Sequence, residues 1–354
     1  MTDYKTYLDE LLLTTAQEGA SDLHLSPGHY PIIRVDSRLL PLTNKTILDK
    51  ETLEGIVFIL LGDRKERFLT QRELDFSYEF DQKARFRVNA YFTQGNVAAT
   101  MRFIPDSVRT IEELNLPLIV KIFTRLSQGF VLVVGPNGHG KSTTLAALVD
   151  LINRERTEKI VTIEDPIEYI FKSDKSVIDQ REVSQDTHSF HRALRSTFRE
   201  DINVIMVGEL RDYETMSAAV TAAETGHLVF ASLHTNSASQ TIERIIDSFP
   251  AAQQNQIRSQ LANTISGVIS QRLIPRIKGG LIPAVEVMIA TTAVRTQIRD
   301  NRLKQLDLVI DTSYDMGMIS LDRSLSELVR RKEITIEKAE FYSLNPSSLR
   351  SLIG

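Results

Sequence analysis

Residues 130–149 read Phe130-Val-Leu-Val-Val-Gly135-Pro-Asn-Gly-His-Gly-Lys-Ser-Thr-Thr144-Leu-Ala-Ala-Leu-Val149. An apolar, β-branched run comes first, the pattern Gly-x-x-x-x-Gly-Lys-Ser follows, and apolar residues then recur at helical spacing. A strand, a glycine-rich turn and a helix are the context in which this pattern binds phosphate. Because its glycines carry no Cβ, the turn can point successive backbone N–H groups at phosphate oxygens. The stretch therefore predicts a nucleoside triphosphate site in an α/β domain.

Two side chains complete this expected phosphate site. Lys141 can reach the outer phosphates, and the hydroxyl of Ser142 can ligate Mg²⁺. The helix that begins near Lys141 adds the positive end of its dipole at the same point. His139 is expected only to occupy a permissive position of the loop. We expect ATP, together with Mg²⁺, to be bound by the residues of the loop and the first helical turn, namely Gly135, Pro136, Asn137, Gly138, His139, Gly140, Lys141, Ser142 and Thr143.

Composition excludes several other classes of protein. With 354 residues, 42% hydrophobic and 25% charged, the chain is typical of a globular protein of about two domains. The 42 Lys and Arg against 46 Asp and Glu give no basic excess of the kind that indicates nucleic-acid binding. The absence of cysteine excludes disulfides and cysteine zinc sites. No apolar run has the length of a signal segment or a membrane span, which predicts a cytoplasmic chain without direct membrane insertion.

The first part of the chain, residues 1–104, reads as an α+β domain. An amphipathic helix is predicted over 3–18, strands over 19–25 and 31–36, and a buried helix over 53–61, closed by Gly62. Strands follow over 76–80, 85–92 and 97–104. In the strand over 85–92, Phe86, Val88, Ala90 and Phe92 alternate with polar residues, which puts Arg87 on the polar face. Residues 105–117 are polar and irregular, with proline at both ends, and are interpreted as a linker.

Residues 118–354 alternate between helix and strand, which indicates a doubly wound, mostly parallel sheet. Its strands are predicted over 130–134, 159–163, 204–207 and 228–232. The loops that follow such strands gather at one edge of the sheet, where ligands bind. Beyond Gln240 the chain is predicted to be helical, most clearly over 241–247, 252–273 and 321–331.

Chemically active side chains follow three of these strands. Glu164 ends the second strand, where a carboxylate can polarise the water that attacks a γ-phosphate, although a solvated loop acid is the alternative. Glu209 follows the third strand and is expected to hold the Mg²⁺ shell, directly or through water, with a surface acid paired with Arg211 as the alternative. His234 ends the fourth strand, where it can report the γ-phosphate through a hydrogen bond. His227, at the start of that strand, is equally consistent with a structural role.

These segments, in this order, resemble the secretion-type ATPases that power type II secretion and type IV pili. The resemblance covers nearly the whole chain and includes Ala20-Ser-Asp-Leu-His-Leu25, Ala84-Arg-Phe-Arg-Val-Asn-Ala90, Thr162-Ile-Glu-Asp-Pro-Ile-Glu168, Gly208-Glu-Leu-Arg-Asp212 and Gly226–Asn236. Extension and secretion members usually carry a four-cysteine zinc module, which this chain lacks. Retraction members carry Ala-Ile-Arg-Asn-Leu-Ile-Arg-Glu, and Ala293-Val-Arg-Thr-Gln-Ile-Arg-Asp300 keeps its arginines. The resemblance therefore favours the retraction ATPases of type IV pili.

What this resemblance implies goes beyond the motifs themselves. It implies a PAS-like N-terminal domain, a RecA-like ATPase domain with a helical C-terminal region, and a homo-hexameric ring. It assigns Glu164 as the catalytic base, Glu209 to the Walker B role, and Arg87 and Arg102 as arginines that reach a neighbouring subunit's nucleotide. The alternative for both arginines is a solvated sheet face. The implied function is ATP-driven pilus retraction in twitching motility, at the cytoplasmic face of the inner membrane, with a pilus platform protein and a sister motor ATPase as partners.

Two other functions stay open from the sequence. A nucleic-acid translocase on the same core is disfavoured by the near-neutral charge and by the lack of an evident basic and aromatic stripe, so no nucleic-acid partner is expected. A nucleotide-switched accessory paralogue with low turnover is the second alternative. It rests on departures from the usual family pattern, where Asn137 and His139 replace Thr and Ser, and Asp201-Ile-Asn203 replaces Asp-Pro-Asp. For Arg295 and Arg299, which share a helix face, an ordinary solvated basic face is the alternative.

Overall fold

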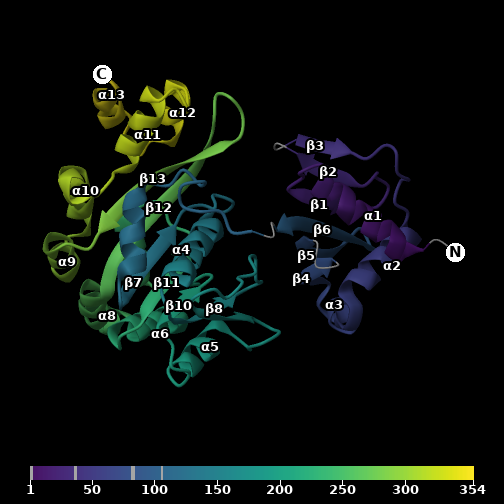
Figure 1. The fold of residues 1–354 in the computed structure, drawn as a ribbon, viewed down its shortest axis with the longest axis horizontal. Coiled ribbons are helices and arrows are strands. Elements are labelled where there is room, and N and C mark those ends of the chain that lie inside the picture. The colour runs from purple at the N-terminus through teal and green to yellow at the C-terminus, as the bar shows by residue number, and fades with distance from the viewer. Residues whose placement is uncertain (1–2, 36–37, 81–83, 105–106) are drawn as a thin grey trace. The chain divides into compact units, whose positions relative to one another are not determined.

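The computed structural model describes residues 3–35, 38–80, 84–104 and 107–354. The chain forms two compact units, one of Met1–Ser107 with Pro166–Ile170 and one of Val108–Asp165 with Phe171–Gly354 (Figure 1). Asp36, at the end of a predicted strand, and residues 105–106, at the start of the predicted linker, lie outside the described residues.

The first unit is an antiparallel sheet of six strands, in the order β3-β2-β1-β6-β5-β4. Helices α1, α2 and α3 lie on one face of this sheet (Figure 1) and bury a core of leucine, valine and phenylalanine side chains. Its elements are α1 (Tyr4–Gln17), β1 (Asp22–Leu25), β2 (Ile32–Val35), β3 (Arg38–Pro41), α2 (Lys50–Leu61), the 3₁₀ turn Gly62–Arg64, α3 (Lys65–Gln71), β4 (Glu73–Phe80), β5 (Ala84–Thr93) and β6 (Asn96–Ile104).

Local sequence signals explain most of this unit. Asp3 caps α1 because its carboxylate accepts from the backbone N–H groups of Lys5 and Thr6. The alternation predicted for 85–92 is confirmed in β5, except that Phe92 is only half-buried. Two elements have no counterpart in the prediction. All four residues of β3 are exposed, so this edge strand shows no alternation, and α3 follows Gly62 after a single 3₁₀ turn.

The second unit is an α/β domain around a mixed sheet of seven strands, in the order β13-β12-β7-β11-β10-β8-β9. Adjacent strands from β12 to β9 are parallel, and only β13 runs antiparallel to its neighbour. The α/β class predicted for this region is confirmed. Its strands are β7 (Gly129–Val134), β8 (Lys159–Glu164), β9 (Val177–Glu182), β10 (Val204–Val207), β11 (Leu228–Leu233), β12 (Ile265–Pro275) and β13 (Leu281–Ile289).

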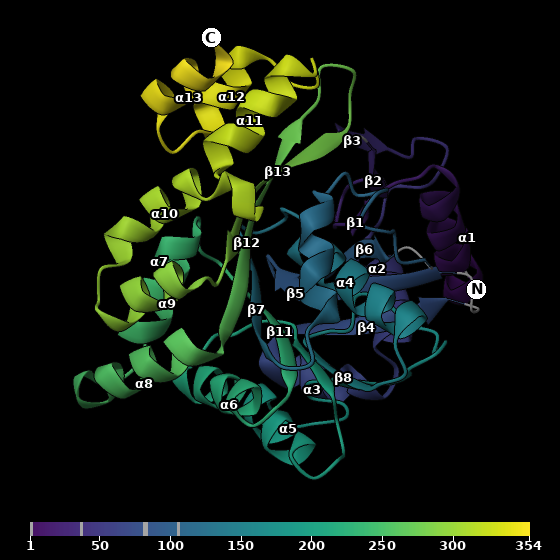
Figure 2. The ribbon, with the colours of Figure 1, turned by 60° about the vertical axis from the view of Figure 1, so that its left-hand side comes forward.

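Helices cover both faces of this sheet, and α11, α12 and α13 lie near one end of the β12–β13 hairpin (Figure 2). The α-helices are α4 (Lys141–Glu155), α5 (Phe190–Thr197), α6 (Tyr213–Glu224), α7 (Ala238–Asp247), α8 (Ala251–Thr264), α9 (Thr292–Arg299), α10 (Leu306–Thr312), α11 (Leu321–Arg330), α12 (Ile336–Tyr342) and α13 (Pro346–Ile353). Short 3₁₀ segments span Leu118–Arg125, Leu303–Gln305 and Tyr314–Met316. No helix in the described ranges is long and apolar enough to cross a membrane.

The helix predicted over 252–273 is wrong beyond Thr264. There α8 ends and the chain enters β12, which pairs with β7 on one side and β13 on the other. Although β12 is mostly buried, its sequence mixes apolar residues with serines, a glutamine and an arginine and shows no clean alternation, so periodicity alone could not distinguish it from a continuation of the helix. Gly267 marks the close packing of this strand, because a Cβ there would lie 2.2 Å from the ring of Phe123.

Candidate nucleotide-binding site

The phosphate loop joins β7 to α4 at the carboxyl edge of the sheet. Gly135, Gly138 and Gly140 adopt φ angles of 149°, 76° and 80°, which side chains rarely allow. Gly140 is the residue before the first helical turn, so the N–H groups of that turn face the loop. Ser142 is exposed at this turn, whereas Lys141 is buried. The loop, its glycines and the helix start are where the sequence predicts them.

Lys141 contacts both its own loop and the end of β11. Its Nζ donates to the carbonyl oxygens of Gly135 and Pro136, each at 3.0 Å, and lies 3.2 Å from Nδ1 of His234. An ammonium group can only donate, so Nδ1 of His234 is the acceptor. The proton of the ring is therefore on Nε2, which lies 3.0 Å from Oε1 of Glu209. The imidazole thus bridges Lys141 and Glu209.

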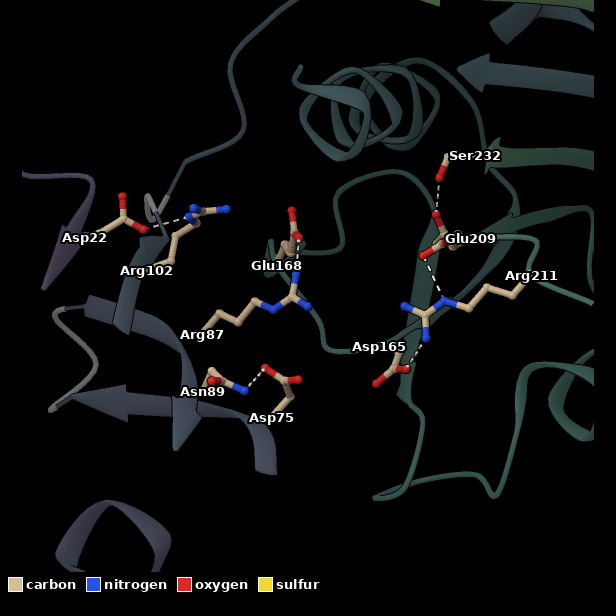
Figure 3. A network of polar contacts seen from close by, with 11 residues as sticks. Asp22, Asp75, Arg87, Asn89, Arg102, Asp165, Glu168, Glu209, Arg211 and Ser232 are labelled. Carbon is tan, nitrogen blue, oxygen red and sulfur yellow. Dashed lines mark hydrogen bonds and ion pairs between the residues drawn. The ribbon is translucent and has the colours of Figure 1, made fainter. Parts of the chain in front are cut away.

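Glu209 extends this bridge to the loops after β10 and β8. Nε of Arg211 donates to Oε2 of Glu209 at 3.0 Å, and Nη1 of Arg211 lies 3.6 Å from the carboxylate of Asp165 (Figure 3). Asp212, the next residue, caps α6 by accepting from the N–H of Thr215. The ends of β7, β11, β10 and β8 are therefore linked by one chain of charged and polar side chains.

Glu164 is the last residue of β8 and is only 6% exposed. Its Oε1 accepts from the hydroxyl of Thr162 at 2.6 Å and from Nε2 of Gln180 at 3.2 Å. Its burial is not that of a solvated loop acid. Gln180 belongs to β9, an edge strand that sequence reasoning missed because its residues are mostly polar and partly exposed.

Arg87 and Arg102 lie directly opposite each other on β5 and β6 of the first unit. Asp22 on β1 is in turn opposite Arg102, so the three side chains share one face of that sheet. Nε of Arg102 donates to Oδ1 of Asp22 at 3.0 Å, and Nη1 of Arg87 donates to Oε1 of Glu168 at 3.2 Å (Figure 3). The side chain of Arg102 is 63% exposed and that of Asp22 is 6% exposed. A buried carboxylate thus orients an exposed guanidinium.

Two residues singled out in the sequence have structural contacts. Nδ1 of His227 lies 3.0 Å from the carbonyl oxygen of Ala222, and its ring packs edge-on against Phe198 at the start of β11, away from the phosphate loop. Nη1 of Arg295 donates to the carbonyl oxygens of Ala262 and Asn263, at 2.8 and 2.6 Å. Arg295 therefore caps the C-terminal end of α8, which corrects the reading of it as part of an ordinary solvated basic face.

Sequence reasoning missed the contribution of β12 to the loop. Gln271 is 3% exposed, and its side chain bonds both the carbonyl oxygen of His139 and the hydroxyl of Thr144. The ring of His139, expected only to fill a permissive position, accepts from the N–H of Leu273. The sequence offered no clear signal, because Gln271 stands between the polar residues Ser270 and Arg272.

The site expected for Mg²⁺ offers only a few protein side chains as ligands. No group of three or more His, Cys, Asp or Glu side chains is placed to hold a metal ion among the residues that the structure describes. Mg²⁺ at nucleotide sites uses one or two protein oxygens together with phosphates and water, so an exposed Ser142 hydroxyl and a carboxylate at the same sheet edge fit such an ion.

Comparisons with known proteins indicate the family of this chain. The family model for type II/IV secretion system proteins matches residues 4–280. The type IV pilus retraction ATPase PilT of Pseudomonas aeruginosa is 45% identical over 94% of this chain and 96% of its own, and a twitching motility protein of Neisseria gonorrhoeae is 44% identical over 90% and 86%. A crystal structure of the pilus retraction motor PilT with bound ADP superposes with a TM-score of 0.89, at 40% identity, over 97% of this chain and 98% of its own. The chain therefore belongs to the type II/IV secretion system protein family.

Proposed function

We propose that this protein is the ATP-hydrolysing motor of type IV pilus retraction, which drives twitching motility. The observation that carries the proposal is the gathering of Lys141, His234, Glu209 and Glu164 at the carboxyl edge of one sheet. Relatives of known name, a pilus retraction ATPase and a twitching motility protein, match along nearly the whole chain. The nucleotide is supported by the loop geometry and by the ADP that the similar PilT structure contains.

We infer a separate role in hydrolysis for each of these residues. Backbone N–H groups of the phosphate loop and Lys141 would hold the phosphates, and Ser142 and Glu209 would hold Mg²⁺, which neutralises charge on the outer phosphates when it is bound. Glu164, fixed by Thr162 and Gln180, would orient and deprotonate the attacking water. His234 lies between Lys141 and Glu209 and would sense the γ-phosphate through whichever of them the nucleotide displaces.

The first unit would act on a neighbouring subunit. We infer a homo-hexameric ring in which Arg87 and Arg102 stabilise charge on the adjacent subunit's nucleotide, since arginines supplied in trans accelerate phosphoryl transfer. The fixed pairing of Arg102 with Asp22 supports such a pre-oriented role. In this proposal the first unit is PAS-like and the second RecA-like. The ring would work in the cytoplasm, peripherally at the inner membrane, with a pilus platform protein and a sister motor ATPase.

The test compares the purified protein with its Glu164→Gln variant. We expect the variant to bind ATP while losing hydrolysis by about a hundredfold or more, because the amide cannot take a proton from water. Mass measured in solution with and without ATP should correspond to six subunits. Equal hydrolysis by both proteins would refute the role of Glu164. Failure of the wild-type gene to restore twitching to a bacterium that lacks its retraction ATPase would refute the retraction function.

A further inference from the structure

The phosphate loop is held from the side by β12. The pairing of β12 with β7 runs to Ser270 opposite Val134, so the next residues of β12 lie beside the loop and not beside the strand. The contact is close, because a Cβ on Gly135 would lie 2.3 Å from the carbonyl oxygen of Gln271. A Cβ on Gly140 would lie 3.0 Å from Nε2 of the same residue. The backbone of β12 therefore forms one wall of the loop.

Hydrogen bonds of the Gln271 and His139 side chains attach the phosphate loop to β12. Nε2 of Gln271 donates to the carbonyl oxygen of His139 at 2.8 Å, while Oε1 of Gln271 accepts from the hydroxyl of Thr144 at 2.7 Å. A carbonyl can only accept, so this contact fixes the orientation of the amide. From the other direction, Nδ1 of His139 accepts from the N–H of Leu273 at 2.9 Å. Both the main chain and the ring of His139 are thus bonded to β12.

These hydrogen bonds act on the most flexible part of the phosphate loop. His139 stands between Gly138 and Gly140, both at positive φ, and nothing lies within 4 Å of where a Cβ on Gly138 would be. A glycine on each side leaves this segment with large conformational freedom, which would be lost when phosphate oxygens order its N–H groups. A loop that is already fixed loses less entropy on binding, so the ligand binds more tightly.

The bond from Leu273 requires an unprotonated acceptor on His139. Burial lowers the pKa of His139, and the charges of Arg272 on β12 and Lys141 on α4 act in the same direction. The surroundings therefore keep the ring neutral, so that Nδ1 can accept from the N–H of Leu273.

We propose that His139 is a positioning residue, whose ring Nδ1 and carbonyl oxygen anchor the phosphate loop to β12 and pre-organise it for the phosphates of the nucleotide. This rests on the nucleotide site proposed above and adds a specific role for one of its residues. The proposal predicts that nucleotide affinity depends on a hydrogen-bond acceptor at the position of Nδ1, and not on an imidazole ring in particular. Asparagine carries an oxygen on Cγ where histidine carries Nδ1, so it can accept the same bond, whereas alanine cannot.

The experiment titrates MgADP into full-length wild type, His139→Ala and His139→Asn, and measures KM and kcat for MgATP. We expect His139→Ala to raise the Kd for MgADP roughly fivefold, the size expected for one lost hydrogen bond, and to raise KM by more than it lowers kcat. His139→Asn should restore most of this loss. His188→Ala, which removes an exposed imidazole elsewhere in the same unit, is the matched control and should change neither value.

A second readout does not depend on activity. Hydrogen exchange at the Leu273 amide should be faster in the nucleotide-free His139→Ala protein than in wild type, and His139→Asn should slow it again. Equal Kd values for wild type and His139→Ala would overturn the inference, and so would an asparagine variant as weak as the alanine variant. If the wild type itself bound no MgADP, the nucleotide site of the proposed function would fail, a result that differs from either of these.

Discussion

Glu286 is a buried carboxylate whose charge is poorly compensated. It lies on β13, is 5% exposed, and its Oε1 accepts from the N–H of Ala238 at 2.6 Å, at the first residue of α7. Burial raises the pKa of Glu286 to about 7, and the charges of Asp307 and Asp311 act in the same direction. The bond from Ala238 and the charge of Arg272 lower the pKa, but by less. Ionising Glu286 therefore costs the folded protein free energy.

The sign and size of this cost follow from the two pKa values. Below about pH 4.5 the carboxyl is protonated in both the folded and the unfolded chain, so the full stability is present. As the pH rises towards about 7, the unfolded chain releases its proton first, and the free energy of unfolding falls. The difference between 4.5 and about 7, at about 1.36 kcal/mol per pKa unit, amounts to about 3 kcal/mol. Glu286→Gln keeps an oxygen for the N–H of Ala238 and removes the titration.

Urea unfolding of wild type and Glu286→Gln between about pH 5 and about pH 8 measures this difference directly. We expect the stability of the variant relative to wild type to increase by about 2.5 kcal/mol across this range, because part of the full difference is already present at pH 5, with most of the change complete slightly above pH 7. Titration of other groups cancels because only the difference between the two proteins is used. Glu243→Gln, which removes an exposed carboxylate of α7, is the control for loss of charge alone. A difference that stays constant with pH would refute the reasoning.

Three further predictions concern the loop, α8 and the first unit. Gly135→Ala should cost at least about 2 kcal/mol and weaken ATP binding, because its Cβ would lie 2.3 Å from the carbonyl of Gln271; unchanged urea unfolding would contradict this. Arg295→Ala should lower the free energy of unfolding by about 1–2 kcal/mol through loss of its bonds to the end of α8, with an unchanged Kd for ATP; a weaker Kd would point to a role in the site. Asp22→Asn should loosen Arg102 and lower kcat roughly two- to tenfold with little change in Kd, as steady-state kinetics would show; an equal kcat would separate Arg102 from catalysis.

The parts of the fold that the sequence predicts well have local causes. The strand before the phosphate loop, the glycines of the loop and the start of α4 follow one another within a short stretch, and β5 alternates between buried and partly exposed residues as far as Tyr91. The carboxyl ends of β8, β10 and β11 meet at one edge because parallel strands must present those ends together. The nearness of His234 to Glu209 follows from the same rule.

What the sequence could not supply depends on contacts between distant segments. Gln271 acts on the loop because β12 lies beside β7, although more than a hundred residues separate them, and no periodicity indicates which strand will lie at that position. The bond between Nδ1 of His139 and Leu273 depends on the same neighbour. The proton position on His234 likewise requires Lys141 on one side and Glu209 on the other. Each of these features is fixed by tertiary packing and not by local preference.

If Lys141 binds the outer phosphates as proposed, its contacts provide a route by which nucleotide binding is communicated. Lys141 donates to the carbonyls of Gly135 and Pro136 and to His234, so it would have to leave some of these acceptors to reach the outer phosphates in the proposed site. Once it left Nδ1 of His234, the ring would keep only its contact at Nε2 with Glu209 among the contacts of this bridge. In the proposed site, phosphate binding and the geometry of His234 would therefore be linked. Because linkage is reciprocal, a subunit movement in the proposed ring that held His234 and Glu209 in their present positions would favour the contact of Lys141 with the ring of His234 and would weaken nucleotide binding by the same free energy.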